Sequence, residues 1–144
     1  MTIRHRLCAS PAYLAEHGEP RVPADLTRHR LVAYGPEAPN YLRSINWALS
    51  LGHDGAPRQP VISVNNSFAV LQAVEAGAGI AALPSYLISL SDNVRVILPE
   101  VEGASFQTYF VYPAELRGSV RVAALRDFLL ARMTPQGVGD GGSR

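Results

Sequence analysis

The residue types that most often carry out chemistry in proteins are few in this sequence and widely spaced. Its candidate metal ligands do not recur at the short spacings of zinc sites; they are His5, His17, His29, His53 and Cys8. No serine lies in the turn pattern of a hydrolase nucleophile, and the order of serine, histidine and acidic residues gives no triad. We therefore expect no metal site, no cofactor and no enzymatic activity. The histidines should lie at the surface or at helix ends, and Cys8 should be buried and unreactive, with redox sensing as the alternative.

The glycines at positions 77 and 79 suggest a nucleotide-binding loop only at first sight. A dinucleotide fingerprint follows a strand and opens a helix, whereas Gly77 and Gly79 close a predicted helix and open a predicted strand. The order of the elements is reversed. The pattern therefore predicts a helix end and a tight turn.

A polar triplet, Asn65-Asn66-Ser67, ends one predicted strand and begins a predicted helix. The first backbone amides of a helix have no acceptor within the helix, so together with hydroxyl and amide side chains they bind anions readily. The same residue types are what ordinary helix capping requires, and the pattern favours neither interpretation. Ser10, after another strand, and Asn40-Tyr41, in a later loop, could line the same rim.

The elements that must position these residues alternate between strand and helix. Apolar and β-branched runs predict strands at 6–9, 31–34, 44–51, 61–64, 79–84, 94–98 and 108–112. Helical spacing and capping residues predict helices at 11–18, 24–29, 68–78, 85–90 and 119–133. This alternation is typical of an α/β fold, a sheet with helices on both faces.

Three of these elements rest on a specific apolar pattern. The strand at 44–51 is predicted because apolar side chains recur at every second residue: Ile45, Trp47, Leu49 and Leu51. The helix at 68–78 should bury one face, made of Phe68, Leu71, Val74 and Ala78. The last helix should begin at Ser119 and bury Val122, Leu125, Phe128 and Leu129.

Length and composition limit the possible partners. The chain has 144 residues, 47% of them hydrophobic, which is enough for one domain with a core. The chain has thirteen basic and twelve acidic residues, so it has no strong electrostatic field that would attract nucleic acid or an anionic membrane surface. The amino-terminal residues lack the apolar core of a secretory signal, and no apolar run approaches the roughly 20 residues of a spanning helix. We expect a cytoplasmic protein without a membrane segment.

Two long motifs, in order, resemble a known family. They are LCASPAYLAEHGEPRVPADLTRHRLVAYG and VISVNNSFAVLQAVEAGAGIAALPSYL, followed by VRVILPEV, TYFVYP and an amphipathic helix. Together they are similar to the effector-binding domain of LysR-type transcriptional regulators, from about residue 3 to residue 133. The resemblance implies a periplasmic-binding-protein-like (type 2) fold, with one complete Rossmann-like subdomain and part of a second.

The resemblance also implies a division of the chain and a binding site. Residues 1–10 would be the first crossover strand, 11–107 the second, effector-binding subdomain, and 108–133 the return crossover strand and a helix of the first subdomain. Residues 134–144 would form a disordered tail. The family's effector contacts fall, by position, on Ser10, Pro39, Asn40, Tyr41, Asn65, Asn66, Ser67 and Phe68.

The function that the resemblance implies is sensing of a small molecule. The chain would be the regulatory module of a bacterial transcription regulator, binding a small, anionic organic effector and controlling the DNA binding of the full-length protein. No winged helix-turn-helix is present, so contact with DNA would depend on that missing part and the chain would be a truncated product or fragment. The apolar faces of 108–112 and 120–133 would then lack partners, which predicts a homo-oligomer. The alternative is a stand-alone solute-binding protein of the same fold.

Overall fold

The computed structural model describes residues 2–133, so the tail predicted at 134–144 lies outside the described residues. The chain divides into two compact units. The larger unit comprises Ile3–Phe106, and the described part of the smaller unit comprises residue 2 and residues 107–133.

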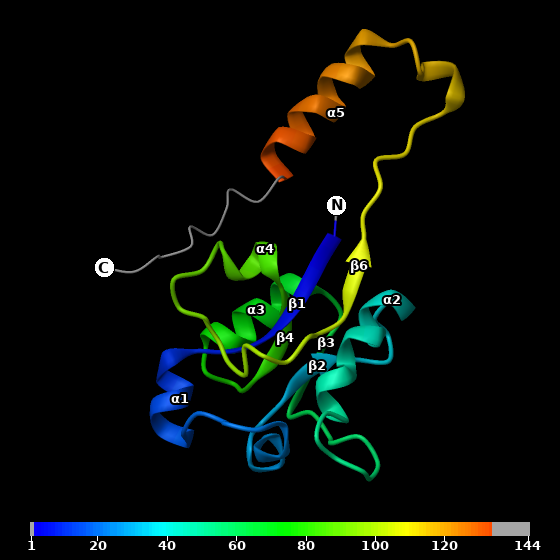
Figure 1. Ribbon diagram of the computed structural model, residues 1–144. Helices are drawn as coiled ribbons and strands as arrows, with labels where there is room; N and C mark the ends of the chain where they lie inside the picture. The colour runs from blue at the N-terminus through cyan, green and yellow to red at the C-terminus, as the bar shows by residue number, and fades with distance from the viewer. Residues whose placement is uncertain (1, 134–144) are drawn as a thin grey trace. The chain divides into compact units, whose positions relative to one another are not determined.

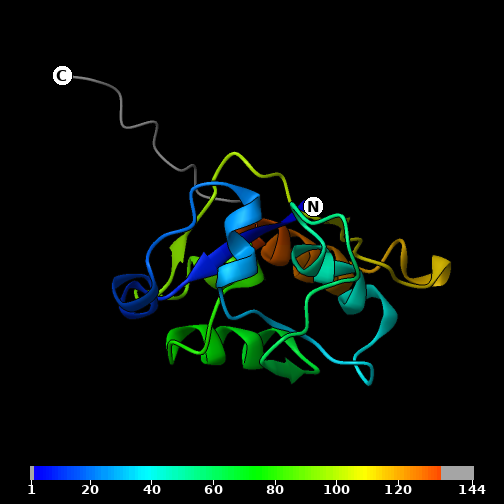
Figure 2. The ribbon, with the colours of Figure 1, turned by 90° about the horizontal axis from the view of Figure 1, so that it is seen from below.

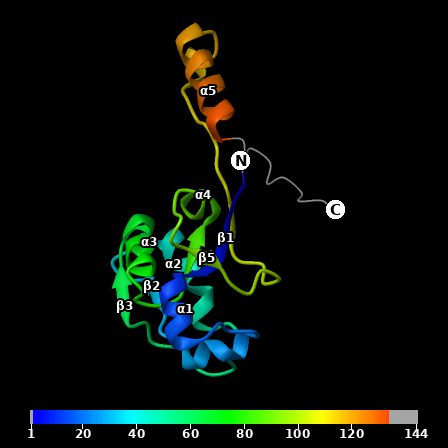
Figure 3. The ribbon, with the colours of Figure 1, turned by 90° about the vertical axis from the view of Figure 1, so that its left-hand side faces the viewer.

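The larger unit is built around a four-stranded sheet and a two-stranded sheet, which a single bridge joins (Figure 1). Strand β1 (Thr2–Ala9) lies between β4 (Ala81–Pro84) and β5 (Arg95–Val96), antiparallel to both, and β6 (Ser105–Gln107) also pairs with β1. Strands β2 (Val32–Tyr34) and β3 (Ile62–Val64) form a parallel pair. A parallel bridge between Leu31 and Ile80 joins this pair to the residue before β4. Figure 3 shows β3 outermost, beyond β2.

Helices cover both sides of these strands. Helix α3 (Ser67–Glu75) contacts β2 and β4, and so does the 3₁₀ helix η2 (Ser44–Leu49), which continues α2 (Asn40–Arg43). In Figure 2 the green helix α3 lies below the blue strand β1, and the teal segment of α2 and η2 lies to the right of β1. The remaining helices of this unit are α1 (Pro11–His17), the 3₁₀ helix η1 (Pro23–Arg28) and α4 (Ser85–Ile88). The predicted α/β arrangement is therefore confirmed.

The prediction of a strand at 44–51 is wrong. The segment forms η2, whose buried residues are Ile45 and Ala48, three positions apart. Trp47 and Leu49 are only partly buried. A 3₁₀ helix places residues three apart on the same face, so the period-two alternation of the large apolar residues was misleading, and Ala48 takes the second buried position. Contact with β2 and β4, rather than local pattern, decides its conformation.

Helix α3 begins and ends as predicted, although its buried face differs. Asn66 is the N-cap and its side chain accepts a hydrogen bond from the amide of Ala69, while Gly77 adopts a positive φ of 76° just after the helix. The buried residues are Val70, Leu71 and Val74. Phe68, predicted to face the core, is 60% exposed, because at about 100° per residue it lies well away from the centre of the face formed by the buried residues.

The smaller unit contains the short 3₁₀ helix η3 (Ala114–Leu116) and the helix α5 (Val120–Met133). The predicted cap of α5 is confirmed, since the Val122 amide donates to the Ser119 hydroxyl at 3.4 Å. The predicted strand at 108–112 is wrong, because pairing with β1 ends at Gln107. The predicted apolar face of α5 is not buried: Val122 and Leu129 are partly exposed, and Leu125 and Phe128 are more than half exposed.

Cys8 and His5, both on β1, lie in the core of the larger unit. Cys8 is fully buried, and burial raises the pKa of its thiol to about 12, so the reactive thiolate is strongly disfavoured. The prediction of a buried, unreactive cysteine is confirmed. The prediction that all four histidines lie at the surface or at helix ends is wrong for His5, which is 3% exposed and packs edge-on against the Phe106 ring.

Burial of His5 predicts a loss of stability in acid. Desolvation lowers its pKa from the ordinary value, opposed by a hydrogen bond between its Nδ1 and the Ala104 carbonyl oxygen, 3.1 Å away. Below about pH 6.5 the unfolded chain therefore binds a proton that the folded chain resists, so the free energy of unfolding falls as pH falls. Urea unfolding at pH 7.5 and 5.5 should show this loss, and His5→Gln should reduce it. His53→Gln, at an exposed histidine, should leave it unchanged.

Candidate functional site

The candidate site lies where three parallel strands end. Strands β2, β3 and β4 run in the same direction, so their carboxyl ends meet at one edge of the sheet, where α/β proteins commonly bind ligands. Helices α2, α3 and α4 each begin just after one of these strands. Seven of the eight predicted site residues lie at this edge: Pro39, Asn40, Tyr41, Asn65, Asn66, Ser67 and Phe68.

Ser10 is not at this edge. Because β1 runs antiparallel to β4, with Cys8 opposite Ala81, its carboxyl end lies beside the beginning of β4. Ser10 is fully buried there and its hydroxyl accepts a hydrogen bond from the Tyr13 amide at 3.3 Å, which caps α1. A Cβ added to Gly77, past the far end of α3 from Ser67, would lie 3.7 Å from the Ser10 hydroxyl. The expectation that Ser10 shares a rim with the other residues is therefore wrong.

The centre of the site is a hydrogen bond between two hydroxyl groups. Tyr34, at the end of β2, donates from its phenol to the Ser67 hydroxyl oxygen at 2.9 Å. Burial raises the pKa of Tyr34, the hydrogen bond with Ser67 lowers it, and electrostatic interaction with Tyr86 and Tyr41 raises it. The phenol is thus neutral at pH 7 and acts as the donor. Since the Ser67 oxygen accepts this bond, its own proton is left to point toward a further acceptor.

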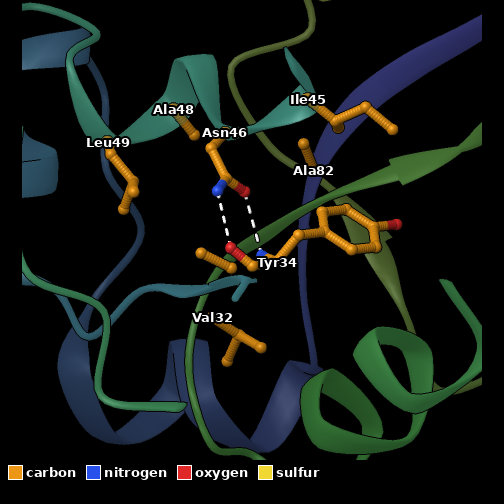
Figure 4. A pocket seen from close by; sticks show the side chains of 8 residues that line it. Val32, Tyr34, Ile45, Asn46, Ala48, Leu49 and Ala82 are labelled. Carbon is orange, nitrogen blue, oxygen red and sulfur yellow. Dashed lines mark hydrogen bonds between the residues drawn. The ribbon is translucent and has the colours of Figure 1, made fainter. Parts of the chain in front are cut away.

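The Tyr34 backbone is held by an asparagine of η2 (Figure 4). The Asn46 side chain accepts from the Tyr34 amide at 2.9 Å and donates to the Tyr34 carbonyl oxygen at 2.7 Å. These two bonds imitate the pairing of a neighbouring strand. A small cavity with space for about one water molecule lies between them and Leu49 and Ala82. Asn46 therefore fixes the position of Tyr34 and, through it, of Ser67.

The start of α3 presents backbone donors beside Ser67. Asn66 satisfies the Ala69 amide through its side chain at 2.9 Å and the Val70 amide through its carbonyl oxygen at 3.3 Å. Within residues 2–133, no acceptor contacts the amides of Ser67 and Phe68, the first two residues of the helix. The Asn66 amide group donates to the Asn65 side chain at 3.0 Å. The triplet thus caps the helix, as one interpretation of the sequence pattern predicts, and leaves two amides available to a ligand.

The predicted residues of α2 are exposed at the same edge. Pro39 precedes the helix, Asn40 accepts a hydrogen bond from the Arg43 guanidinium, and Tyr41 is 63% exposed. The Arg43 contact brings a positive charge to the beginning of α2. Tyr41 also contributes to the raised pKa of Tyr34.

Sequence reasoning missed Tyr34, Asn46 and Tyr86. Tyr34 ends an apolar run that predicts only a strand, and Asn46 lies within the alternation that predicts a strand at 44–51. Tyr86 is the second residue of α4 and is 48% exposed, as Tyr41 and Phe68 are exposed at the second positions of α2 and α3. A polar residue between Ile45 and Trp47 was the one available signal for Asn46.

Other kinds of site find no support in the described residues. Within residues 2–133, no group of three or more histidine, cysteine, aspartate or glutamate side chains is placed to hold a metal ion. None of the helices in that range is long and apolar enough to cross a membrane.

Comparison with known sequences identifies relatives among transcription regulators. The family model described as the LysR substrate binding domain matches residues 1–134. An HTH-type transcriptional regulator of Haemophilus influenzae is 30% identical over 129 residues, which are 86% of this chain and 43% of that protein. The regulator YhjC of Escherichia coli K12 is 30% identical over 131 residues, 88% of this chain and 43% of that protein. The chain thus spans less than half the length of these curated relatives.

Solved structures share the fold. The regulatory domain of CrgA, a LysR-type transcriptional regulator from Neisseria meningitidis, superposes with a TM-score of 0.70 at 23% identity, covering 93% of this chain and 66% of that chain. The regulatory domain of AphB from Vibrio vulnificus superposes with a TM-score of 0.63 at 22% identity, covering 90% of this chain and 66% of that chain. The predicted periplasmic-binding-protein-like fold is therefore confirmed. On the match over residues 1–134, this chain belongs to the LysR substrate-binding-domain family.

Proposed function

We propose that this chain is the effector-sensing part of a LysR-type transcription regulator and that effector binding controls the DNA binding of the longer protein. Its family and the HTH-type regulators to which it is similar support this role. Contact with DNA would be made by a helix-turn-helix outside this chain, because its thirteen basic and twelve acidic residues give no strong positive field. We propose a cytoplasmic location and no catalytic activity.

We propose the division of the chain that the family implies. Residues 1–10 would serve as the first crossover strand, 11–107 as the effector-binding subdomain and 108–133 as the return segment and a helix of the other subdomain. The boundary between the two compact units, at Phe106 and Gln107, is compatible with this division. No specific observation on the described residues favours the alternative function, that of a stand-alone solute-binding protein.

The effector is proposed to be a small organic anion held at the start of α3. The observation that carries this proposal is the Tyr34–Ser67 hydrogen bond, which directs the Ser67 proton outward beside the free amides of Ser67 and Phe68. These donors suit a carboxylate, with Asn40 and Tyr41 at the edge of the site. The sequence contains no lysine, so the charge would be met by amide and hydroxyl dipoles and by Arg43.

Removing the Ser67 hydroxyl should weaken effector binding by about 1–3 kcal/mol, because one hydrogen bond to a charged group is lost. A thermal-shift screen of aromatic acids, amino acids and sugar acids would identify a ligand, and calorimetry would compare wild type with Ser67→Ala. Tyr34→Phe should weaken the binding of the same ligand, because it removes the phenol that orients the Ser67 hydroxyl. Ser50→Ala, at an exposed serine of the same unit, is the matched control. Equal affinity of Ser67→Ala and wild type for a confirmed ligand would show that the anion lies elsewhere.

We also propose that the chain self-associates through the smaller unit. Several of its large apolar side chains are more than half exposed: Tyr109, Val111, Val120, Leu125, Phe128 and Leu130. Apolar surface of this extent on a soluble protein commonly marks an interface. Light scattering after size exclusion should show dimers or larger assemblies at micromolar concentration. The double variant Leu125→Ser/Phe128→Ser should shift them toward monomer, and a wild-type monomer would contradict the proposal.

A further inference from the structure

A second cluster of titratable side chains lies at the opposite edge of the sheet from the candidate site. The Tyr13 ring of α1, which is 1% exposed, stacks on His17 with centroids 4.4 Å apart, and the Arg30 guanidinium lies 5.3 Å from its centroid. The Tyr13 hydroxyl lies 3.1 Å from His29 Nδ1 and accepts a hydrogen bond from the Arg30 amide at 2.9 Å. None of these side chains takes part in the proposed function.

The hydrogen bonds of this cluster determine where its protons lie. The Tyr13 oxygen accepts from the Arg30 amide, and within residues 2–133 the one possible acceptor beside its hydroxyl is His29 Nδ1, so the arrangement that satisfies both side chains has Tyr13 donating its proton to His29 Nδ1. His29 is then neutral, with its proton on Nε2. Protonation of Nδ1 would turn His29 into a donor and leave the buried Tyr13 proton without an acceptor, which is costly in a buried position.

The cluster joins four parts of the larger unit. Tyr13 belongs to α1, and residues 29–30 directly precede Leu31 and strand β2. The Arg30 side chain donates to the Gly77 carbonyl oxygen at 3.1 Å, after α3, and the Arg30 carbonyl oxygen accepts from the Ile80 amide at 2.9 Å, before β4. We propose that the Tyr13–His29 hydrogen bond is an acid-sensitive latch that holds α1 to this edge of the sheet and opens when His29 is protonated.

The charges around His29 favour opening in acid. Burial lowers the pKa of His29, the charge of His17 lowers it further, and Asp25 of η1 opposes both. Asp25 is itself engaged by the amides of Arg21 and Val22, at 2.9 and 3.2 Å.

The Arg30 guanidinium lies over the same ring, so protonation of His29 would place a second positive charge beside Tyr13. Glu16 lies 3.9 Å from His17 and is exposed to solvent, so it compensates only weakly. Helix α3 runs from Ser67 at the candidate site to this cluster, so the latch and the site share one element.

Hydrogen exchange of the whole chain between pH 7.5 and 5.5 tests the latch. The amides of Leu14 and Gly18 donate the hydrogen bonds at the beginning and at the end of α1. After correction for intrinsic exchange rates, these amides should lose protection several-fold in acid relative to the amides of β4. His29→Gln keeps a polar side chain that cannot be protonated, and should retain protection in acid. His53→Gln should behave as wild type.

Two results would overturn the latch. One is an equal loss of α1 protection in wild type and in His29→Gln, which would assign the acid effect to other groups such as His5. The other comes from nitrogen NMR of the His29 ring, which needs no variant: at pH 7.5 a neutral ring with its proton on Nε2 is expected, and a proton on Nδ1 would contradict the mechanism. Neither measurement involves an effector, so the latch and the proposed effector site can fail independently.

Discussion

Replacing Leu83 by alanine is expected to lower the free energy of unfolding by about 2–5 kcal/mol, because it leaves a cavity at the centre of the larger unit. Leu83 is fully buried in β4, opposite Arg6 of β1, and belongs to the single core cluster of the larger unit. The helices α3 and η2 both contact β4, and their packing against the strand limits how far the cavity can collapse. Since a domain is stable by only about 5–15 kcal/mol, this change is a large fraction of the total.

The measurement for Leu83→Ala is urea unfolding followed by circular dichroism, with Leu90→Ala as the matched control. Leu90 follows α4 and is 76% exposed, so its truncation should change the free energy of unfolding by no more than about 0.5 kcal/mol. Similar effects of the two substitutions would mean that β4 does not form the centre of the core.

Replacing Gly79 by alanine is expected to destabilise the larger unit by about 1–3 kcal/mol or somewhat more, because backbone atoms occupy the space that the new methyl group needs. A Cβ on Gly79 would lie 2.4 Å from the Arg30 carbonyl oxygen and 2.8 Å from its carbon. That same oxygen accepts the hydrogen bond from the Ile80 amide, next to the bond from the Val32 amide to the Ile80 carbonyl oxygen. Relief of the clash must therefore separate β2 from the beginning of β4.

The same unfolding measurement tests Gly79→Ala, and Gly118→Ala provides the comparison. A Cβ on Gly118 would meet no atom within 4 Å, so the control adds a methyl group in open space. Wild-type stability of Gly79→Ala would contradict a close approach of residue 79 to the Arg30 carbonyl group. Gly79→Ala should also weaken the Tyr13–His29 latch, because Arg30 takes part in both.

Most of the helices and the strands of the larger unit's core were predictable because their signals are local. The caps of α3 and α5, the positive φ at Gly77 and the strand at β2 follow from residue types within a few positions of each other. The family also followed from the sequence, since two motifs in a fixed order are specific without any knowledge of contacts. Burial of Cys8 followed from its place in an apolar run.

The tertiary structure decided what depends on direction and distance between strands. Ser10 directly follows β1 just as Asn65 directly follows β3. Only the antiparallel direction of β1 places Ser10 at the opposite edge of the sheet. The segment of η2 is helical because it packs across β2 and β4, and this packing brings Asn46 to the Tyr34 backbone. The residues of the candidate site were thus largely set by local sequence. Their grouping, and the Tyr34–Ser67 bond that joins them, came from the order and direction of the strands, which no local pattern encodes.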